Sequence, residues 1–207
     1  MDVLSSWINS VWLDGQQRVR FQKSFSSSKP YLHGVLPSFL IESKARALLA
    51  ALKEEKFTYK NSDLFSLNQT ADFSSVRNEL LKSFYAFASS KEFALLMKEI
   101  TGLDVKPGAL DLAGSLYLSG DYLLCHDDQV EDRKIAYVLY LSEGFTQRDG
   151  AEFVVFNNKS GRPTTRAHAY PPEWNSLMLF EVSPLSYHMV GENTSLKKRY
   201  AIGGWLH

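Results

Sequence analysis

Two histidines and one aspartate in this chain have the types and spacing of a metal site. His126 stands two residues before Asp128, and His188 follows sixty-two residues after His126. Two imidazoles and one carboxylate can occupy one face of an octahedral Fe(II), which leaves three coordination positions for a bidentate co-substrate and for O₂. A zinc or manganese protein could use the same ligand types, so the three residues alone do not decide the metal.

Arg199, eleven residues after His188, indicates what a co-substrate would carry. It begins the last predicted strand and is followed by small apolar residues, which favours an internal strand. A buried guanidinium needs an anionic partner. That partner is either Glu181 or Asp111, or the carboxylate of a bound dicarboxylic acid gripped by the guanidinium fork. Tyr117 could donate its phenol hydrogen to the same ligand carboxylate, and the nearness of Arg199 to His188 favours this second reading.

Three other histidines compete with His188 for the third metal position. His33 precedes the predicted helices, His168 lies in the middle of a predicted strand, and His207 is terminal. Of the four, His188 has an arginine downstream on the next strand, so we expect His188 to be the ligand.

Side chains alternate along an extended segment, so His126 and Asp128 would face the same way. Asp127 and Cys125 would then point to the opposite side. We expect Cys125 to be a buried, inert residue rather than a ligand, because thiolates favour softer metals.

Composition sets the outer bounds of the interpretation. The 207 residues fit one domain with an N-terminal extension, and the chain carries 23 basic and 23 acidic residues. This balance provides no global field that would recruit nucleic acid or an anionic membrane. A single cysteine excludes an intrachain disulfide, and no segment has the pattern of a signal peptide or a membrane span. We therefore expect a soluble cytoplasmic protein.

The order of predicted elements indicates an α+β fold. Residues 2–13 have helical spacing, residues 15–30 resemble a polar connector, and residues 31–36 form the first predicted strand. Helices are predicted at residues 42–56 and 75–88, and a third begins at the capping pattern Ser89-x-x-Glu92 and ends at Gly102. Residues 61–73 between the first two read as a loop. Further strands are predicted at residues 112–118, 135–141, 152–156, 165–170, 177–182 and 199–206.

This strand count suits a double-sheet jelly roll supported by N-terminal helices. We expect residues 1–29 to be an N-terminal helix and linker, and residues 30–207 to be the domain that carries the site.

Several local motifs resemble a known family. They are Leu123-Leu124-Cys125-His126-Asp127-Asp128, residues 133–141 (RKIAYVLYL), residues 172–177 (PEWNSL), residues 180–184 (FEVSP) and residues 204–207 (GWLH). With them the chain resembles the Fe(II)/2-oxoglutarate-dependent dioxygenases, in the prolyl-hydroxylase branch that modifies a small-subunit ribosomal protein. The similarity extends over about residues 30–207.

The resemblance implies a double-stranded β-helix fold, with His126, Asp128 and His188 as iron ligands. It implies Arg199 and Tyr117 as binders of the 2-oxoglutarate carboxylate. The co-substrates would be 2-oxoglutarate and O₂, with ascorbate as a supporting reductant, and the substrate a prolyl residue of a ribosomal protein. No direct contact with nucleic acid or membrane is expected.

Three departures from the family pattern stand out. Eukaryotic members of the branch have a second, metal-free jelly roll, whereas this sequence stops at His207. Ala201 stands where many members have a hydroxyl residue, and residues 149–152 (DGAE) replace a common Gly-Gly pair. Oxidation of a small molecule or another side chain, and a non-catalytic binding module, remain alternatives. The sequence leaves open the oligomeric state and the proline carbon that would be oxidised.

Overall fold

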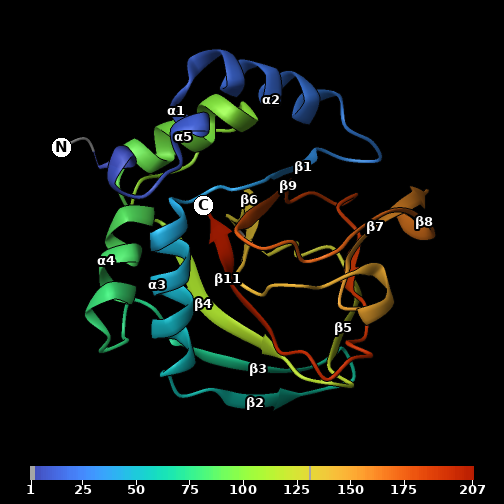
Figure 1. The fold of residues 1–207 in the computed structure, drawn as a ribbon. Helices are drawn as coiled ribbons and strands as arrows, with labels where there is room; N and C mark the ends of the chain where they lie inside the picture. The colour runs from blue at the N-terminus through green and yellow to red at the C-terminus, as the bar shows by residue number, and fades with distance from the viewer. Residues whose placement is uncertain (1–2, 131) are drawn as a thin grey trace.

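In the computed structural model, which describes residues 3–130 and 132–207, most helices come from the first half of the chain and most strands from the second (Figure 1). Eleven strands of the described residues form one curled, antiparallel sheet. They are β1 (His33–Leu36), β2 (Thr58–Asn61), β3 (Phe65–Asp72), β4 (Leu110–Tyr117), β5 (Tyr122–His126), β6 (Ile135–Tyr140), β7 (Phe153–Lys159), β8 (Arg162–Tyr170), β9 (Ser176–Glu181), β10 (His188–Val190) and β11 (Arg199–Leu206).

The sheet runs in the order β1-β9-β6-β11-β4-β3-β5-β10-β7-β8, with β2 added to the outer side of β3. Strands from distant parts of the sequence are therefore neighbours. β11, for example, lies between β6 and β4, as expected for an internal strand. This order places the ends of β5 and β10 beside each other, where the site lies.

The helices cover one side of the curled sheet (Figure 1). They are η1 (Leu4–Ser6), α1 (Ser10–Leu13), α2 (Gly15–Ser27), α3 (Glu42–Lys53), α4 (Glu79–Ala88) and α5 (Lys91–Thr101), and a short turn η2 (Gln147–Asp149) lies in the second half. No helix in the described part of the chain is long and apolar enough to cross a membrane.

Alternation along the central strands divides the core into two layers. Leu139 of β6 and Ile202 of β11 belong to the larger cluster, which packs against the helices. Tyr140 and Ala201, one position away on the same strands, belong to a second cluster inside the curl of the sheet. Successive side chains on a strand point to opposite faces, so a single strand serves both layers. The inner layer surrounds the site.

The N-terminal prediction was wrong in two places. The expected helix over residues 2–13 is interrupted, because Ile8 forms a β-bridge with Leu40 and the Asn9 side chain caps a separate helix α1. Asp2 lies outside the described residues. The expected connector is the helix α2, capped by the side chain of Asp14 and held by buried Phe25. Most side chains of α2 are polar, so its sequence lacks the apolar periodicity of a helix, and its stability depends on tertiary packing.

The expected loop at residues 61–73 was also wrong, since residues 65–72 form β3 in the interior of the sheet and β2 precedes it. Phe65, Leu67 and Gln69 line a cavity, and the hydroxyl residues Ser66 and Thr70 between and after them are buried. A strand with a polar side chain on its cavity face and hydroxyls on its buried face loses the alternation that usually reveals a strand.

The other predicted elements are confirmed to within a few residues. Gly102 ends α5 in the left-handed conformation, with φ of 80°, as the C-terminal glycine predicted. The helix cap, however, is Ser90 rather than Ser89, because the Ser90 side chain accepts the hydrogen bond from the Phe93 amide. The short strand β10 was not predicted, whereas β5 covers the first part of the extended segment expected at His126.

Candidate active site

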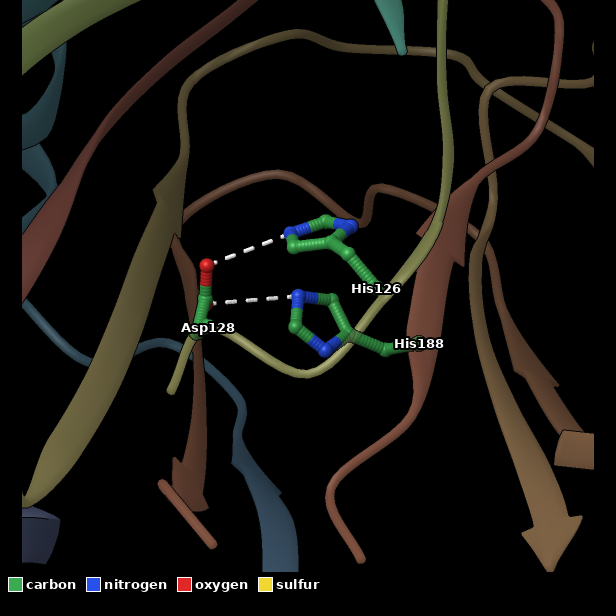
Figure 2. A group of neighbouring side chains, drawn as sticks. All are labelled: His126, Asp128 and His188. Carbon is green, nitrogen blue, oxygen red and sulfur yellow. Dashed lines mark ion pairs between the residues drawn. The ribbon is translucent and has the colours of Figure 1, made fainter. Parts of the chain in front are cut away.

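His126, Asp128 and His188 lie together and line the inner cavity (Figure 2). The Asp128 carboxylate is 3.2 Å from Nε2 of His126 and 3.4 Å from Nε2 of His188. One potential ligand atom from each residue lies within 4.8 Å of the other two. The three side chains therefore converge as the sequence predicted, in a geometry that a single metal ion could bridge.

The backbone brings the three residues together in a way that the sequence did not reveal. His126 ends β5 and is paired directly with His188, which begins β10. The chain then leaves the strand, and Asp128 has a φ of 62°, in the left-handed region. The proximity of His126 and Asp128 was predicted correctly, but strand alternation is not its cause. A left-handed turn at a residue type that tolerates it directs the carboxylate back to the histidine.

Hydrogen bonds orient both imidazoles toward the carboxylate. Nδ1 of His126 lies 2.8 Å from the Leu124 carbonyl, and Nδ1 of His188 lies 2.8 Å from the Ser186 carbonyl. A carbonyl only accepts, so each Nδ1 carries a hydrogen. In the neutral ring Nε2 then has the lone pair that binds a metal, and in the protonated ring Nε2 donates to Asp128 instead. Metal-binding histidines are commonly fixed in this manner by their second nitrogen. The donor set thus fits Fe(II).

The carboxylate is held in its ionised form. Burial opposes the charge on Asp128, but hydrogen bonds from His126 and His188 keep its pKa well below the ordinary value. Burial likewise disfavours protonation of His126, and the hydrogen bond with Asp128 outweighs it and raises the His126 pKa. An ionised carboxylate is the form that a cation binds.

The competing histidines lie elsewhere. His33 contacts Tyr31 and Tyr170, His168 contacts the Lys29 carbonyl, and His207 faces Asp111. Cys125 is half-buried rather than fully buried, and it lies outside the group of converging ligand atoms. Burial raises the pKa of its thiol, which therefore stays protonated and a poor metal ligand.

Arg199 is 1% exposed and has no ion-pair partner among the described residues. Its Nε and Nη2 atoms are buried without a hydrogen-bond acceptor, and neither Glu181 nor Asp111 pairs with it in this part of the chain. The guanidinium instead lies 4.7 Å from the ring of Tyr117. A buried cation without an anion is costly, so the arrangement points to a ligand that carries the missing negative charge.

Tyr117 lies where the sequence predicted, and Tyr140 is a residue that the prediction missed. The two phenols flank the guanidinium, with Tyr140 5.0 Å away and its hydroxyl buried without a partner. Tyr140 pairs across the sheet with Ala201, the position where a family hydroxyl is absent. Alternation along the predicted strand at residues 135–141 places Tyr140 on the inner face, and this pattern could have identified it from the sequence. Burial raises the pKa of Tyr117 to about 12, opposed by the charge of Arg199, so this phenol stays a donor.

These residues line one cavity of about 600 Å³. Its lining includes Arg199, His126 and His188, and also Arg133 and Trp205. The Arg133 guanidinium lies 3.4 Å from the centre of the Trp205 ring, and the indole Nε1 is buried without a partner. The cavity is therefore lined by two residues with unpaired donors, Arg199 and Trp205, together with the three converging ligands.

Comparison with known proteins agrees with this geometry. Residues 112–207, which contain the three converging residues and Arg199, match the profile of the 2OG-Fe(II) oxygenase superfamily. The chain carries a 2OG-Fe(II) oxygenase domain. Members of this superfamily use Fe(II), 2-oxoglutarate and O₂, and the His-Asp-His group is present here.

Curated relatives extend the similarity over most of the chain. This chain is 32% identical over 206 residues to prolyl 3-hydroxylase OGFOD1 of Xenopus laevis, and the match covers 97% of this chain and 39% of the relative. It is 34% identical over 167 residues to prolyl 3,4-dihydroxylase OGFOD1 of Ostreococcus tauri, covering 72% of this chain and 32% of the relative. The chain thus spans about two fifths or less of the length of these relatives.

The fold is shared with solved oxygenases. A prolyl-4-hydroxylase from Pseudomonas putida superposes with a TM-score of 0.72 at 18% identity, covering 92% of this chain and 98% of that one. The jelly-roll fold predicted from the strand count is thereby confirmed.

Proposed function

We propose that this chain is a 2-oxoglutarate-dependent dioxygenase that hydroxylates a prolyl residue of a protein substrate. The observation that carries the proposal is the unpaired Arg199 guanidinium, buried in the same cavity as His126, Asp128 and His188. A protein that used the three ligands for a structural zinc or manganese ion would have no reason to bury an unpaired cation beside them.

Each residue has a role that follows from its position. His126, Asp128 and His188 would hold Fe(II), and the metal supplies the activation of O₂ that C–H oxidation requires. Arg199 would grip the distal carboxylate of 2-oxoglutarate with its planar fork, and Tyr117 and Tyr140 would each donate a phenol hydrogen to it. The buried apolar walls exclude water and keep the co-substrate in one orientation.

The part of the cavity lined by Arg133 and Trp205 would receive the substrate. Trp205 offers an unpaired indole hydrogen and Arg133 a guanidinium stacked on the same ring, and both line the cavity. Donors of this kind suit the main-chain carbonyls of a peptide. The volume of about 600 Å³ lies in the usual range for small-ligand pockets and leaves room for one side chain beside the co-substrate.

The prolyl substrate is supported by the names of the two OGFOD1 relatives. A small-subunit ribosomal protein as the target, a cytoplasmic location, and ascorbate as supporting reductant remain predictions from the family resemblance. The assignment of residues 1–29 as a separate N-terminal segment also remains a prediction, although Trp7, Trp12 and Phe25 belong to the same buried cluster as the sheet.

A second candidate is an oxygenase acting on a small molecule. The fold favours neither a protein substrate nor a small molecule, because it is shared by an α-ketoglutarate-dependent epimerase, SnoN from nogalamycin biosynthesis, with a TM-score of 0.68 at 11% identity. Substrate identity therefore has to be tested on the protein itself.

The experiment is a succinate-release screen with Fe(II), 2-oxoglutarate and proline-containing peptides from small-subunit ribosomal proteins. A hit is followed by mass spectrometry, which should show the gain of one oxygen atom on a proline. The matched control is the same peptide with that proline replaced by alanine. Succinate release without a proline-dependent product would refute the prolyl substrate. If the protein also bound no 2-oxoglutarate, the proposed 2-oxoglutarate-dependent reaction would be refuted as well.

A further inference from the structure

A second cluster of titratable rings lies outside the site, at the seam where the two ends of the curled sheet approach each other. β1 and β8 are the terminal strands of the sheet order and are not paired with each other. Side chains connect them instead. Nε2 of His33 on β1 is 2.9 Å from the Tyr170 hydroxyl on β8, and the ring of His168 lies 5.3 Å from that of His33.

The hydrogen of the Tyr170 phenol points to a basic nitrogen. Nδ1 of His33 lies 2.8 Å from the Tyr31 carbonyl, which can only accept, so Nδ1 carries the imidazole hydrogen. Nε2 is then the acceptor, and Tyr170 donates to it. Burial lowers the pKa of His33, which keeps the imidazole neutral and its Nε2 lone pair available.

Tyr140, Tyr31 and Tyr117, which lie near the site, lack such a base. The Tyr140 hydroxyl has no partner, and Tyr31 donates at 3.4 Å to the Tyr187 carbonyl, which cannot take up a proton. Tyr117 lies against the positive charge of Arg199, which disfavours loss of an electron from its ring. Tyr170 differs because its proton can move to an imidazole as an electron leaves.

A single layer of rings separates Tyr170 from the ligand cluster. Tyr170 pairs across the β7–β8 ladder with Phe153, so their side chains share one face of the sheet. Phe153 in turn stacks on His188, with 5.0 Å between ring centres and 19° between ring planes. On the outer side Tyr170 is half-buried and lies 6.0 Å from the exposed His168. The pair thus lies between the site and the surface.

We propose that Tyr170 and His33 form a redox pair that removes an oxidising equivalent from the metal site when no substrate is bound. This inference rests on the proposed function, because 2-oxoglutarate turnover supplies the oxidant. One electron passes from Tyr170 through the Phe153 layer to the site, and the phenol proton moves to Nε2 of His33. The products are a neutral tyrosyl radical and an imidazolium. A one-electron reductant of the ascorbate class then returns the electron at the surface, and His33 returns the proton.

The test uses enzyme loaded with Fe(II) and 2-oxoglutarate, exposed to O₂ without peptide and frozen at intervals. Succinate reports turnover, and electron paramagnetic resonance reports the radical. Wild-type protein should release succinate and show a tyrosyl signal. Tyr170→Phe, which removes one oxygen atom, should release succinate but lose that signal. Tyr59→Phe, at an exposed tyrosine on β2, is the matched control and should keep it.

Two further measurements strengthen the test. His33→Gln keeps a donor for the Tyr31 carbonyl but has no basic nitrogen, so the tyrosyl signal should be lost there too. Mass spectrometry of peptides around Phe153, Phe180 and His188 should show more oxidation in Tyr170→Phe than in wild type after equal succinate release. If His33→Gln does not fold, the Tyr170→Phe comparison decides the matter.

The possible failures are distinguishable. An unchanged radical signal in Tyr170→Phe would overturn the redox pair while leaving the oxygenase intact. The redox pair would also be overturned if wild-type protein released succinate without a tyrosyl signal and its site residues were oxidised to the same extent as in Tyr170→Phe. Absence of succinate in every sample would overturn the redox pair, because no oxidant then forms without substrate, and the peptide screen decides separately whether the oxygenase proposal stands.

Discussion

Replacing Arg199 tests the co-substrate pocket most directly, and Arg199→Met is the sharpest change because methionine fills similar space without charge. The buried guanidinium has at least two N–H groups with no acceptor in the protein. If both bind one carboxylate of 2-oxoglutarate, the substitution removes two charge-assisted hydrogen bonds worth about 1.5 kcal/mol or more each. A loss of about 3 kcal/mol weakens the Kd for 2-oxoglutarate by about a hundredfold.

The same substitution has an unusual expected effect on the ligand-free protein. Burying unpaired donors costs about 1–3 kcal/mol each, while stacking of the cation on Tyr117 and Tyr140 recovers about 0.5–2 kcal/mol per ring. Removing the charge therefore leaves the folding free energy unchanged or more favourable. The Tm of ligand-free Arg199→Met should be no lower than that of wild type, although its stabilisation by 2-oxoglutarate is lost.

The assay is an anaerobic titration of 2-oxoglutarate into Fe(II)-loaded protein, read by the charge-transfer absorption of the chelate, with thermal unfolding measured in parallel. Arg166→Met is the control, because Arg166 is exposed on β8 and forms an ion pair with Glu152 at 3.5 Å, away from the cavity. Arg199→Lys keeps the charge without the fork and should give an intermediate Kd. Wild-type affinity in Arg199→Met would refute the assignment of the pocket.

Four further predictions follow from the same structure. Tyr140→Phe removes one buried hydroxyl and should weaken 2-oxoglutarate binding by about tenfold, the worth of about 1.4 kcal/mol; no change in the Kd would show that this hydroxyl does not reach the ligand. Asp128→Ala should abolish succinate release, whereas Asp127→Ala should be mild, and persistence of turnover in Asp128→Ala would disprove the metal assignment. Trp205→Phe keeps the ring but loses the indole hydrogen, so it should raise the KM for a peptide substrate by about tenfold and leave the Kd for 2-oxoglutarate unchanged; the reverse pattern would contradict a role in substrate binding. The hydrogen bond with Lys197 lowers the pKa of Asp149 from 3.8 to about 2, so the ionised carboxylate stabilises the fold above pH 3.8 and this stabilisation disappears as the pH falls through about 2. The Tm difference between wild type and Asp149→Asn should therefore shrink between these two pH values. A constant Tm difference would exclude the ionisation of Asp149 as its cause.

Chain geometry explains why the chemistry of the site could be predicted so far from sequence alone. His126, Asp128, His188 and Arg199 are residue types with few chemical uses in combination. His126, His188 and Arg199 lie at the ends of strands, and Asp128 follows the end of β5 by two residues. Strands β6, β9 and β11 could be predicted because one face packs against the helices and the other against an apolar interior. Both faces are apolar, so these strands appear in the sequence as short hydrophobic runs.

Elements whose pattern depends on the cavity were not predictable in this way. β3 presents Gln69 and Leu67 to the cavity and buries Ser66 and Thr70, so it resembled a loop. α2 is polar over most of its surface and depends on Phe25, which is buried against other elements. In both cases the surroundings that stabilise the segment come from distant parts of the chain.

The sequence by itself determined which residues could hold iron and a dicarboxylic acid, because ligand chemistry belongs to residue types and their strand positions. Only the tertiary structure decided how they meet. The left-handed turn at Asp128, the pairing of β5 with β10 and the placing of Tyr140 opposite Ala201 are long-range or conformational facts. No local pattern encodes them, since each depends on which strands become neighbours when the sheet closes around the cavity.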